Sequence, residues 1–331
     1  MSGLIFRNNN PFRYNNRCLF LQDITLHVVK PAFQLSFLSP KYWPTWIAVG
    51  ILYSISWLPW RIQLAMGRML GRLLGKVVKS RARVAKRNIE LCFPEMPKEQ
   101  QHTLFIQSLE SAGIALFESG MGWWWPNWRI RRLTRVEGYE HIEAIIKKGK
   151  GVMGLAIHNM NLEVNCRAIG LIHPSVVFYR RHNNPLMEYF QYHGRARSNK
   201  LMIHKKGVSE MIKSLNHQEL CLYLPDQDYG PRRSEFVPFF AVKQTATTTG
   251  TLLFMQNANC ESVFLLPLRT RDGYVIKVLP GLDNLPSGDD KQDVTRINQQ
   301  IESMILEAPE QYLWMHKRFK TRPKEDSNSL Y

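Results

Sequence analysis

Hydrophobic and polar positions change their spacing near residue 150. Beyond that point, short apolar runs bounded by Gly, Pro or charge predict buried strands at 151–157, 175–179, 220–224, 262–268 and 274–279. The segments between them predict helices at 162–170, 185–197, 207–215, 245–257 and 293–307. Alternating strands and helices are typical of an α/β fold, with a mixed, mainly parallel sheet flanked by helices. Arg271-Asp272-Gly273 predicts a hairpin that adds an antiparallel pair.

Before this region, residues 42–60 form a stretch of nineteen residues without a charge, with tryptophans near both ends. A helix of that length spans roughly 28 Å, close to the ~30 Å hydrocarbon core of a bilayer. Indole rings at both ends are typical of a membrane–water interface. We therefore predict a transmembrane or membrane-anchoring helix over 39–61; a half-inserted helix and a buried core helix are the alternatives. A signal peptide is disfavoured because about forty residues precede the stretch.

Residues 62–90 continue with basic residues at helical spacing, Arg68, Arg72, Lys76, Lys79 and Arg83, opposite an apolar side. This pattern predicts a basic amphipathic helix that lies in an anionic headgroup layer. Positive charge after an apolar span places this side in the cytoplasm.

Charge and composition then narrow the function classes. The 331 residues carry a formal net charge of +17, and no acidic residue lies between Asp23 and Glu90. The hydrophobic content of 44% is enough for a core, which excludes a disordered or fibrous protein. A basic surplus predicts a polyanionic partner: nucleic acid, an anionic membrane surface or a phosphorylated substrate. The adjacent apolar stretch favours the membrane over nucleic acid.

Other segments carry weaker signals. The five cysteines form no CxxC pair, so we expect free thiols in a reducing compartment. The tryptophan-rich segment 123–128 predicts either a surface that meets lipid or a tryptophan-rich corner of the core. We divide the chain into a leader that is poorly ordered or peripheral (1–38), the two membrane segments, a catalytic domain (91–323) and a polar, frayed tail (324–331).

Candidate chemistry gathers where strands end, because ligands of parallel sheets bind beyond the carboxyl ends of strands. His158 follows the first predicted strand, and Glu163 follows five residues later. With His158 in the turn and Glu163 in the first helical turns, the carboxylate would orient the imidazole, which would take a proton from a hydroxyl. The spacing alone is a weak signal, and a histidine at a strand end is often structural.

No Gly-x-Ser-x-Gly elbow, Cys–His pair, HExxH or phosphate-loop motif occurs. A base without a protein nucleophile favours direct attack by a substrate hydroxyl on an activated acyl donor. Asp226 and Asp228 follow another strand, where they would position Arg232 or a sugar hydroxyl; a metal would need a third ligand, and none is evident. The substrate-binding candidates, suited to acidic groups, are Arg180, Arg195, Arg197, Asn199, Lys200, Asp226, Asp228 and Arg232.

Several blocks of sequence resemble the late acyltransferases of lipid A biosynthesis in Gram-negative bacteria, the lauroyl and palmitoleoyl transferases. They are ELCFPEMP (90–97), HNMNLE (158–163), YRRHNNPLMEYF (179–190), GRARSNK (194–200), PDQDYGPRRSEFVPFFAV (225–242), TATTTGT (245–251) and APEQYLWMHKRFKTRP (308–323). With the entrance to the apolar stretch, the resemblance covers roughly residues 37–323. The family's His-x4-Asp/Glu motif falls on His158 and Glu163.

The resemblance implies a glycerolipid-acyltransferase-like fold and an enzyme of the bacterial inner membrane, single-pass or monotopic, with its catalytic domain on the cytoplasmic side. The expected reaction moves an acyl chain from acyl-carrier protein, as co-substrate, to a hydroxyacyl hydroxyl of Kdo2-lipid IV(A), with no cofactor and no metal. Expected partners are the acidic carrier protein, this lipid and an anionic membrane, without nucleic acid. The alternatives are acylation of another phospho- or glycolipid and a non-enzymatic, membrane-tethered basic scaffold. Acyl length stays open.

Overall fold

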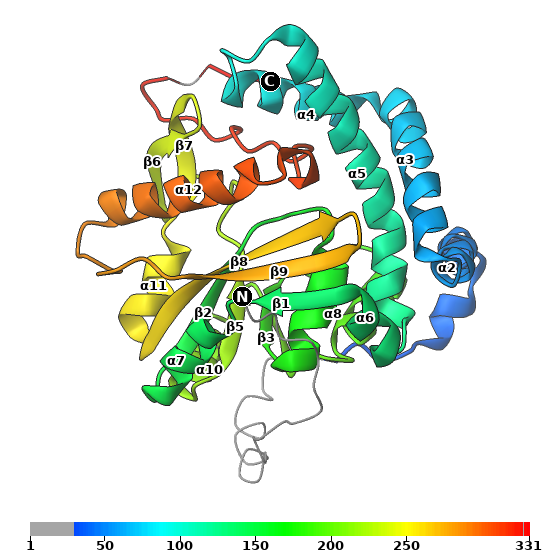
Figure 1. Ribbon diagram of the computed structural model, residues 1–331, viewed down its shortest axis with the longest axis horizontal. Coiled ribbons are helices and arrows are strands. Elements are labelled where there is room, and N and C mark those ends of the chain that lie inside the picture. The colour runs from blue at the N-terminus through cyan, green and yellow to red at the C-terminus, as the bar shows by residue number, and fades with distance from the viewer. Residues whose placement is uncertain (1–29, 327) are drawn as a thin grey trace.

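The computed structural model describes residues 30–326 and 328–331, and its centre is a seven-stranded mixed sheet (Figure 1). The strand order is β1-β9-β8-β2-β5-β3-β4, and every neighbouring pair is parallel except the β8–β9 hairpin. The strands are β1 (Thr134–Glu137), β2 (Gly151–Ala156), β3 (Val176–Tyr179), β4 (Leu201–His204), β5 (Leu220–Tyr223), β8 (Cys260–Thr270) and β9 (Gly273–Pro280). A separate antiparallel pair comprises β6 (Ser234–Phe239) and β7 (Val242–Thr248). The predicted α/β class, the five strands and the hairpin are confirmed.

The helices of the N-terminal half are α2 (Trp43–Ser56), α3 (Trp60–Val77), α4 (Lys79–Cys92), α5 (Lys98–Trp124), α6 (Asn127–Leu133) and α7 (Glu140–Lys147). Those of the C-terminal half are α8 (Leu162–Ile172), α9 (Pro185–Arg195), α10 (Val208–Asn216), α11 (Gly250–Asn257) and α12 (Asp290–Leu306). Short 3₁₀ turns occupy Leu35–Leu38, Pro40–Tyr42 and Pro309–Gln311.

Two hydrophobic clusters cover the two faces of the sheet. Within β2, Val152 belongs to the cluster that includes α7 and α8, while Met153 and Leu155 belong to the cluster that includes α10, α11 and α12. Figure 1 shows α8 and α12 on opposite sides of the sheet. Because side chains alternate between faces and both faces are covered, the central strands are apolar throughout.

Four strands were not expected. The strands β1 and β4 lie at the two edges of the large sheet and contain only four residues each. The strand β7 extends to Thr248, so the helix expected over 245–257 begins only at Gly250. Pairing with β6 holds this threonine-rich segment extended, and the helix follows once the pairing ends.

The expected membrane helix over 39–61 is not found as such. Helix α2 has 14 residues, about 21 Å, and the chain turns at Trp57–Pro59 before α3. Pro59 is the extended N-cap of α3, and a proline removes a backbone donor that a continuous helix would need. Among the described residues, no helix combines the length and apolar character needed to cross a bilayer.

The predicted basic amphipathic segment 62–90 is two helices, α3 and α4, which meet at Val78. Figure 1 shows α3 alongside α5. The two helices meet through Gly67 and Gly71, which face Gly113. A Cβ on Gly113 would lie 2.1 Å from the carbonyl oxygen of Gly67, so only glycine permits this backbone approach. The outer face of α3 exposes Met69, Leu73 and Val77 beside its basic residues.

Both ends of the described part of the chain contact the rest of the fold. Most of the leader lies outside the described residues, but Phe37 is buried against Tyr42 and Tyr189. At the other end, the Tyr331 hydroxyl donates to Asn88 Oδ1 at 2.5 Å and accepts from the Phe319 backbone N–H at 3.0 Å. The end of the tail is therefore anchored rather than frayed.

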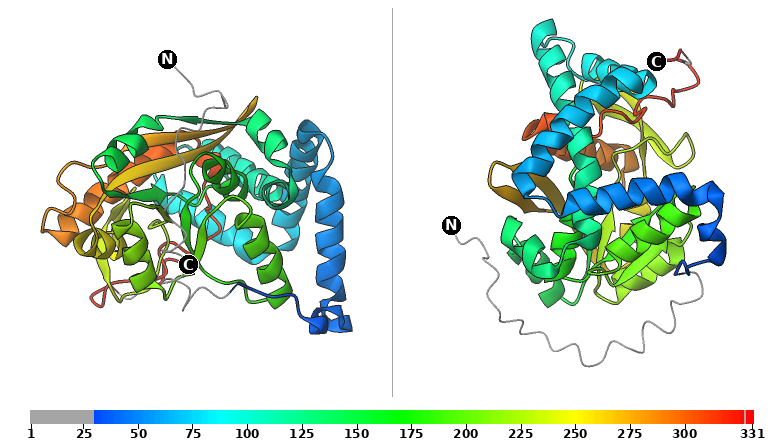
Figure 2. Two further views of the ribbon diagram at one scale, coloured as in Figure 1. Left: turned by 90° about the horizontal axis from the view of Figure 1, so that it is seen from below. Right: turned by 90° about the vertical axis from the view of Figure 1, so that its right-hand side faces the viewer.

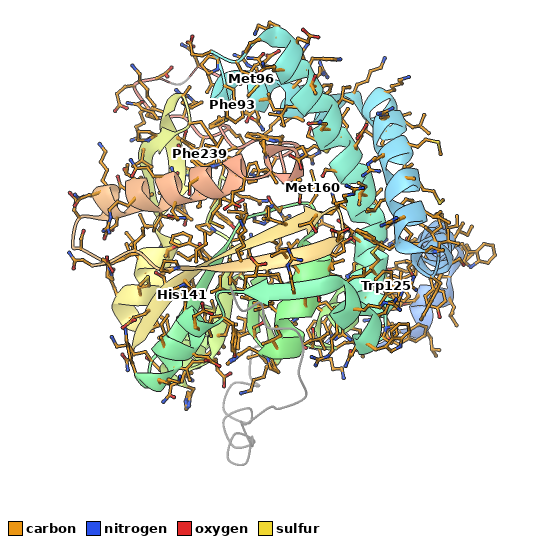
Figure 3. All side chains as sticks on the ribbon, viewed as in Figure 1. Phe93, Met96, Trp125, His141, Met160 and Phe239 are labelled. Carbon is orange, nitrogen blue, oxygen red and sulfur yellow. The ribbon has the colours of Figure 1, made fainter. Side chains whose placement is uncertain are left out.

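The tryptophan-rich segment 123–128 mostly follows the core interpretation. Trp123 and Trp125 are buried, whereas Trp128 is exposed. The indole of Trp125 donates to the Ser56 backbone carbonyl at 2.5 Å, which connects the end of α5 to the end of α2. Figure 2 shows the ribbons of these two helices side by side, and Figure 3 labels Trp125 near α2. Arg129 stacks on the Trp125 ring, 3.9 Å from its centroid.

Candidate active site

A cavity of about 760 Å³ opens at the carboxyl ends of the central parallel strands. These ends meet at one edge of the sheet, so residues distant in sequence converge there. The predicted site residues that line the cavity are His158, Arg180, Arg195, Asp228 and Arg232. Five of the predicted site residues therefore line one cavity.

His158 stands directly beyond β2 and is held by Asp226, which follows β5. Its ring Nδ1 lies 2.6 Å from Asp226 Oδ1, and its backbone N–H donates to Asp226 Oδ2 at 2.9 Å. The neighbouring strands β2 and β5 run parallel, which brings both residues to the same edge. Because the carboxylate accepts the Nδ1 proton, the ring's other nitrogen, Nε2, is left to accept a proton from substrate.

Asp226 is completely buried, and its pKa reflects two opposing influences. Burial alone would raise the pKa of the carboxyl group, but the charge and hydrogen bonds of His158 outweigh it and lower the pKa. The carboxylate thus stays ionised next to the imidazole, where it stabilises a protonated ring.

Glu163 does not orient His158, contrary to the sequence-based expectation. Glu163 is the second residue of α8 and forms a bidentate ion pair with Arg195 of α9. The Nη2–Oε1 and Nε–Oε2 distances are 2.5 and 3.0 Å. The Trp123 indole also donates to Glu163 Oε2 at 3.0 Å. The helical start points this carboxylate toward α9, whereas Asp226 reaches His158 from the adjacent strand. Although burial disfavours its charged form, the contact with Glu163 raises the pKa of Arg195.

Three further candidates are not in the cavity lining. Arg197 donates to the Trp123 backbone carbonyl at 2.6 Å. Asn199 is buried and bonds the Ser175 hydroxyl and the Arg195 carbonyl. Lys200 forms an ion pair with Glu219 at 2.5 Å. These side chains contact neighbouring parts of the fold instead of the cavity. The expectation that they bind substrate does not agree with this geometry.

The second aspartate of the 226–228 pair also has a different role from the one expected. Asp228 accepts the backbone N–H and hydroxyl of Thr321 at 2.7 and 2.8 Å, and the backbone N–H of Gly230 at 2.8 Å. It therefore ties the C-terminal segment to the cavity instead of positioning Arg232, which is exposed at the cavity mouth.

The C-terminal segment contributes cavity-lining residues that the residue patterns of the sequence did not single out. Leu313 donates its backbone N–H to the His158 carbonyl at 3.0 Å, and Met160 donates to the Gln311 carbonyl at 2.7 Å. Figure 3 places Met160 beside this segment, above the sheet. His316 and Lys320 line the cavity as a result. In the sequence, the block WMHKRFK carries no signal besides its resemblance to the family.

The cavity continues from these polar groups into an apolar interior. Its inner walls come from the sheet and α8 and comprise Ala156, Ile169, Val177, Leu222, Leu265 and Ile276. The site therefore combines a polar mouth with an apolar recess, which is suited to a ligand that has a reactive head and a hydrocarbon tail. Within the described residues, no group of three His, Cys, Asp or Glu side chains is arranged to hold a metal ion.

Comparison with known proteins places this chain in a family. Residues 30–321 match the model of the bacterial lipid A biosynthesis acyltransferases. The chain is 41% identical to a lipid A biosynthesis lauroyltransferase of Escherichia coli K12, over 89% of this chain and 97% of that protein. It is 39% identical to the palmitoleoyltransferase of the same strain, over 90% and 98%, and 29% identical to its myristoyltransferase, over 88% and 91%. The chain belongs to the bacterial lipid A biosynthesis acyltransferase family and is an acyltransferase.

Proposed function

We propose that this enzyme transfers an acyl chain from acyl-carrier protein to a hydroxyacyl hydroxyl of Kdo2-lipid IV(A), with His158 as general base. The observation that carries the proposal is the His158–Asp226 pair at the mouth of an apolar recess. A general base beside an apolar recess is what direct attack by a lipid hydroxyl on a bound thioester requires. No protein nucleophile takes part.

In the proposed step, His158 Nε2 takes the proton of the acceptor hydroxyl while its oxygen bonds to the thioester carbonyl carbon. The carbon–sulfur bond then breaks, and the imidazolium returns the proton to the departing thiolate. The products are the new ester and the free thiol of the carrier protein. Asp226 keeps the Nδ1 proton in place and stabilises the imidazolium between these events.

Charge at the mouth supports acidic substrates. Arg180, Arg232, Arg233 and Lys320 line the cavity and are exposed. Phosphates and acidic sugars on the lipid, and the acidic surface of the carrier protein, would both be attracted to these cations. The apolar recess would take the acyl chain. Glu163 remains a predicted site residue, and we propose that it acts by holding Arg195 at the cavity wall.

We further propose that α2 and α3 seat the enzyme on the cytoplasmic surface of the inner membrane without spanning it. Large apolar side chains are exposed along both helices: Trp43, Ile47 and Ile51 on α2, and Met69, Leu73 and Val77 on α3. Arg68, Arg72 and Lys76 lie beside the second group. Exposed apolar and basic residues together favour the headgroup region of an anionic bilayer.

The direct test supplies membranes that carry the protein with acyl-carrier-protein thioester and Kdo2-lipid IV(A), and follows the acylated lipid by mass spectrometry. Wild type should form the product, and His158→Ala should lower the rate on the order of 10²–10⁴-fold. His102→Ala, an exposed histidine on α5, is the matched control and should retain full activity. Absence of product from wild type, or full activity of His158→Ala, contradicts the proposal.

A further inference from the structure

His316 lies in the same cavity as His158 but takes no part in the mechanism described above. The segment that carries it crosses the end of β2. Asn159 and Tyr312 form an isolated antiparallel bridge, and the Tyr312 hydroxyl donates to the Asp226 carbonyl at 3.2 Å. These contacts join the segment that carries His316 to the ends of β2 and β5, where His158 and Asp226 lie.

Hydrogen bonding decides which nitrogen of His316 carries the proton. The backbone N–H of Asp228 donates to His316 Nε2 at 3.3 Å, so Nε2 acts as the acceptor. A neutral imidazole with an accepting Nε2 has its proton on Nδ1. Among the described residues, Nδ1 has no hydrogen-bond partner, and the ring lines the cavity.

The ring is also held in its neutral form. Burial, and next the positive charge of neighbouring His158, lower the pKa of His316 to about 4. Near pH 7 it is therefore neither a proton acceptor for the hydroxyl nor an imidazolium. What it offers is a fixed N–H donor beside the base, and a neutral imidazole can stabilise a developing oxyanion.

We propose that His316 is a second catalytic residue, whose neutral Nδ1–H donates a hydrogen bond to the thioester carbonyl oxygen as it becomes an oxyanion. This inference rests on the proposed acyl transfer. When the hydroxyl oxygen bonds to the carbonyl carbon, the π electron pair moves onto the carbonyl oxygen and His158 takes the hydroxyl proton. His316 shares its proton with the oxyanion without transferring it, and the pair returns to the carbon as the carbon–sulfur bond breaks.

The competing interpretation is structural: His316 would serve only to accept the Asp228 N–H and hold the 226–228 turn. Two substitutions separate the two roles, because an asparagine amide reaches the position of Nδ1 and a glutamine amide reaches that of Nε2. His316→Asn keeps a donor toward the cavity and loses the contact with Asp228. His316→Gln keeps an acceptor for Asp228 and loses the cavity donor.

The assay measures kcat and KM with acyl-carrier-protein thioester and Kdo2-lipid IV(A). We expect His316→Gln to lower kcat about 10²–10³-fold, the usual effect of removing one oxyanion donor, with little change in KM. His316→Asn should stay within about tenfold of wild type. The opposite order, or wild-type kcat in His316→Gln, overturns the inference. If wild type itself is inactive, the proposed function fails instead, so the two failures are distinguishable.

A dithioester donor, in which sulfur replaces the carbonyl oxygen, gives a readout that a structural role would not move. Sulfur is a weak hydrogen-bond acceptor. The substitution should therefore slow wild type and His316→Asn more than His316→Gln. An equal slowing of all three proteins contradicts the inference, and thermal unfolding verifies that each variant is folded. If His316→Gln does not fold, the comparison of kcat between wild type and His316→Ala, with both donors, decides in its place.

Discussion

Charged side chains are usually exposed and large apolar ones buried. The strand-end site buries a charge, whereas the N-terminal helical arm, α2 and α3, exposes large apolar side chains. At the site, Asp226 is 0% exposed and carries a charge, whereas on the arm Ile47 is 63% and Met69 is 69% exposed. A buried charge is tolerated only when it is paired, and exposed apolar side chains indicate a surface that meets an apolar partner. If α2 and α3 attach the enzyme to lipid as proposed, the catalytic chemistry and the attachment depend on different residues, so each should be removable without the other.

The largest expected effect is at the site. Asp226→Asn leaves an amide beside Nδ1 and removes the charge that stabilises the imidazolium, so kcat should fall about 10²–10⁴-fold. Binding of the protein to anionic vesicles should be unchanged. Steady-state kinetics and vesicle sedimentation measure the two properties. A parallel loss of vesicle binding would show that the site and the arm are not separable.

The ion pair between Glu163 and Arg195 tests how far the site depends on internal support. Glu163→Gln leaves the guanidinium buried without its charge partner, which should cost about 3–5 kcal/mol of unfolding free energy. Chemical denaturation monitors the change. The matched control is Glu137→Gln, which breaks the exposed pair with Arg135 and should change stability by less than about 1 kcal/mol. Equal effects of both substitutions would disprove a supporting role for the buried pair.

The arm should respond in the opposite way. Leu73→Glu places a charge on the exposed apolar face of α3, and the lost apolar contact of about 1.5–3 kcal/mol should weaken vesicle binding roughly 10–100-fold. Activity toward substrates dispersed in detergent should stay near wild type. Leu306→Glu introduces the same change at an exposed leucine of α12 and should leave vesicle binding unchanged. Equal weakening by both variants would argue against a specific membrane face.

The smallest expected effect is a pH dependence of stability. The folded-state pKa of His316 is lowered from 6.5 to about 4, so the unfolded chain binds the extra proton more readily between these values. Stability must then decrease as pH falls from about 6.5 toward 4. After allowance for solvent screening, the contribution is about 1 kcal/mol. As pH falls through this range, the Tm of His316→Asn should decrease less steeply than the Tm of wild type, as measured by thermal unfolding. Parallel Tm profiles would show that this histidine does not titrate differently on folding.

Prediction from the sequence succeeded for elements whose local pattern matches their final environment. The central strands, such as β2 and β5, are continuous apolar runs because both faces are covered. The edge strands β1 and β4 are short and partly polar, and β7 resembled a helix, because pairing with distant segments decides their conformation. The uncharged stretch 42–60 has the length of one membrane span, but α2 ends at Ser56 and α3 begins after Pro59.

The sequence by itself determined the α/β class, the basic arm, His158 at a strand end and the family resemblance, since these depend on local pattern and residue type. Only the tertiary structure decided which carboxylate serves the histidine. Glu163 is five residues away and pairs with Arg195, while Asp226 is 68 residues away and contacts the ring. Parallel neighbouring strands bring their ends together whatever their separation along the chain, and a helix directs its side chains by its own geometry. Distance in sequence therefore carried no information about this pairing.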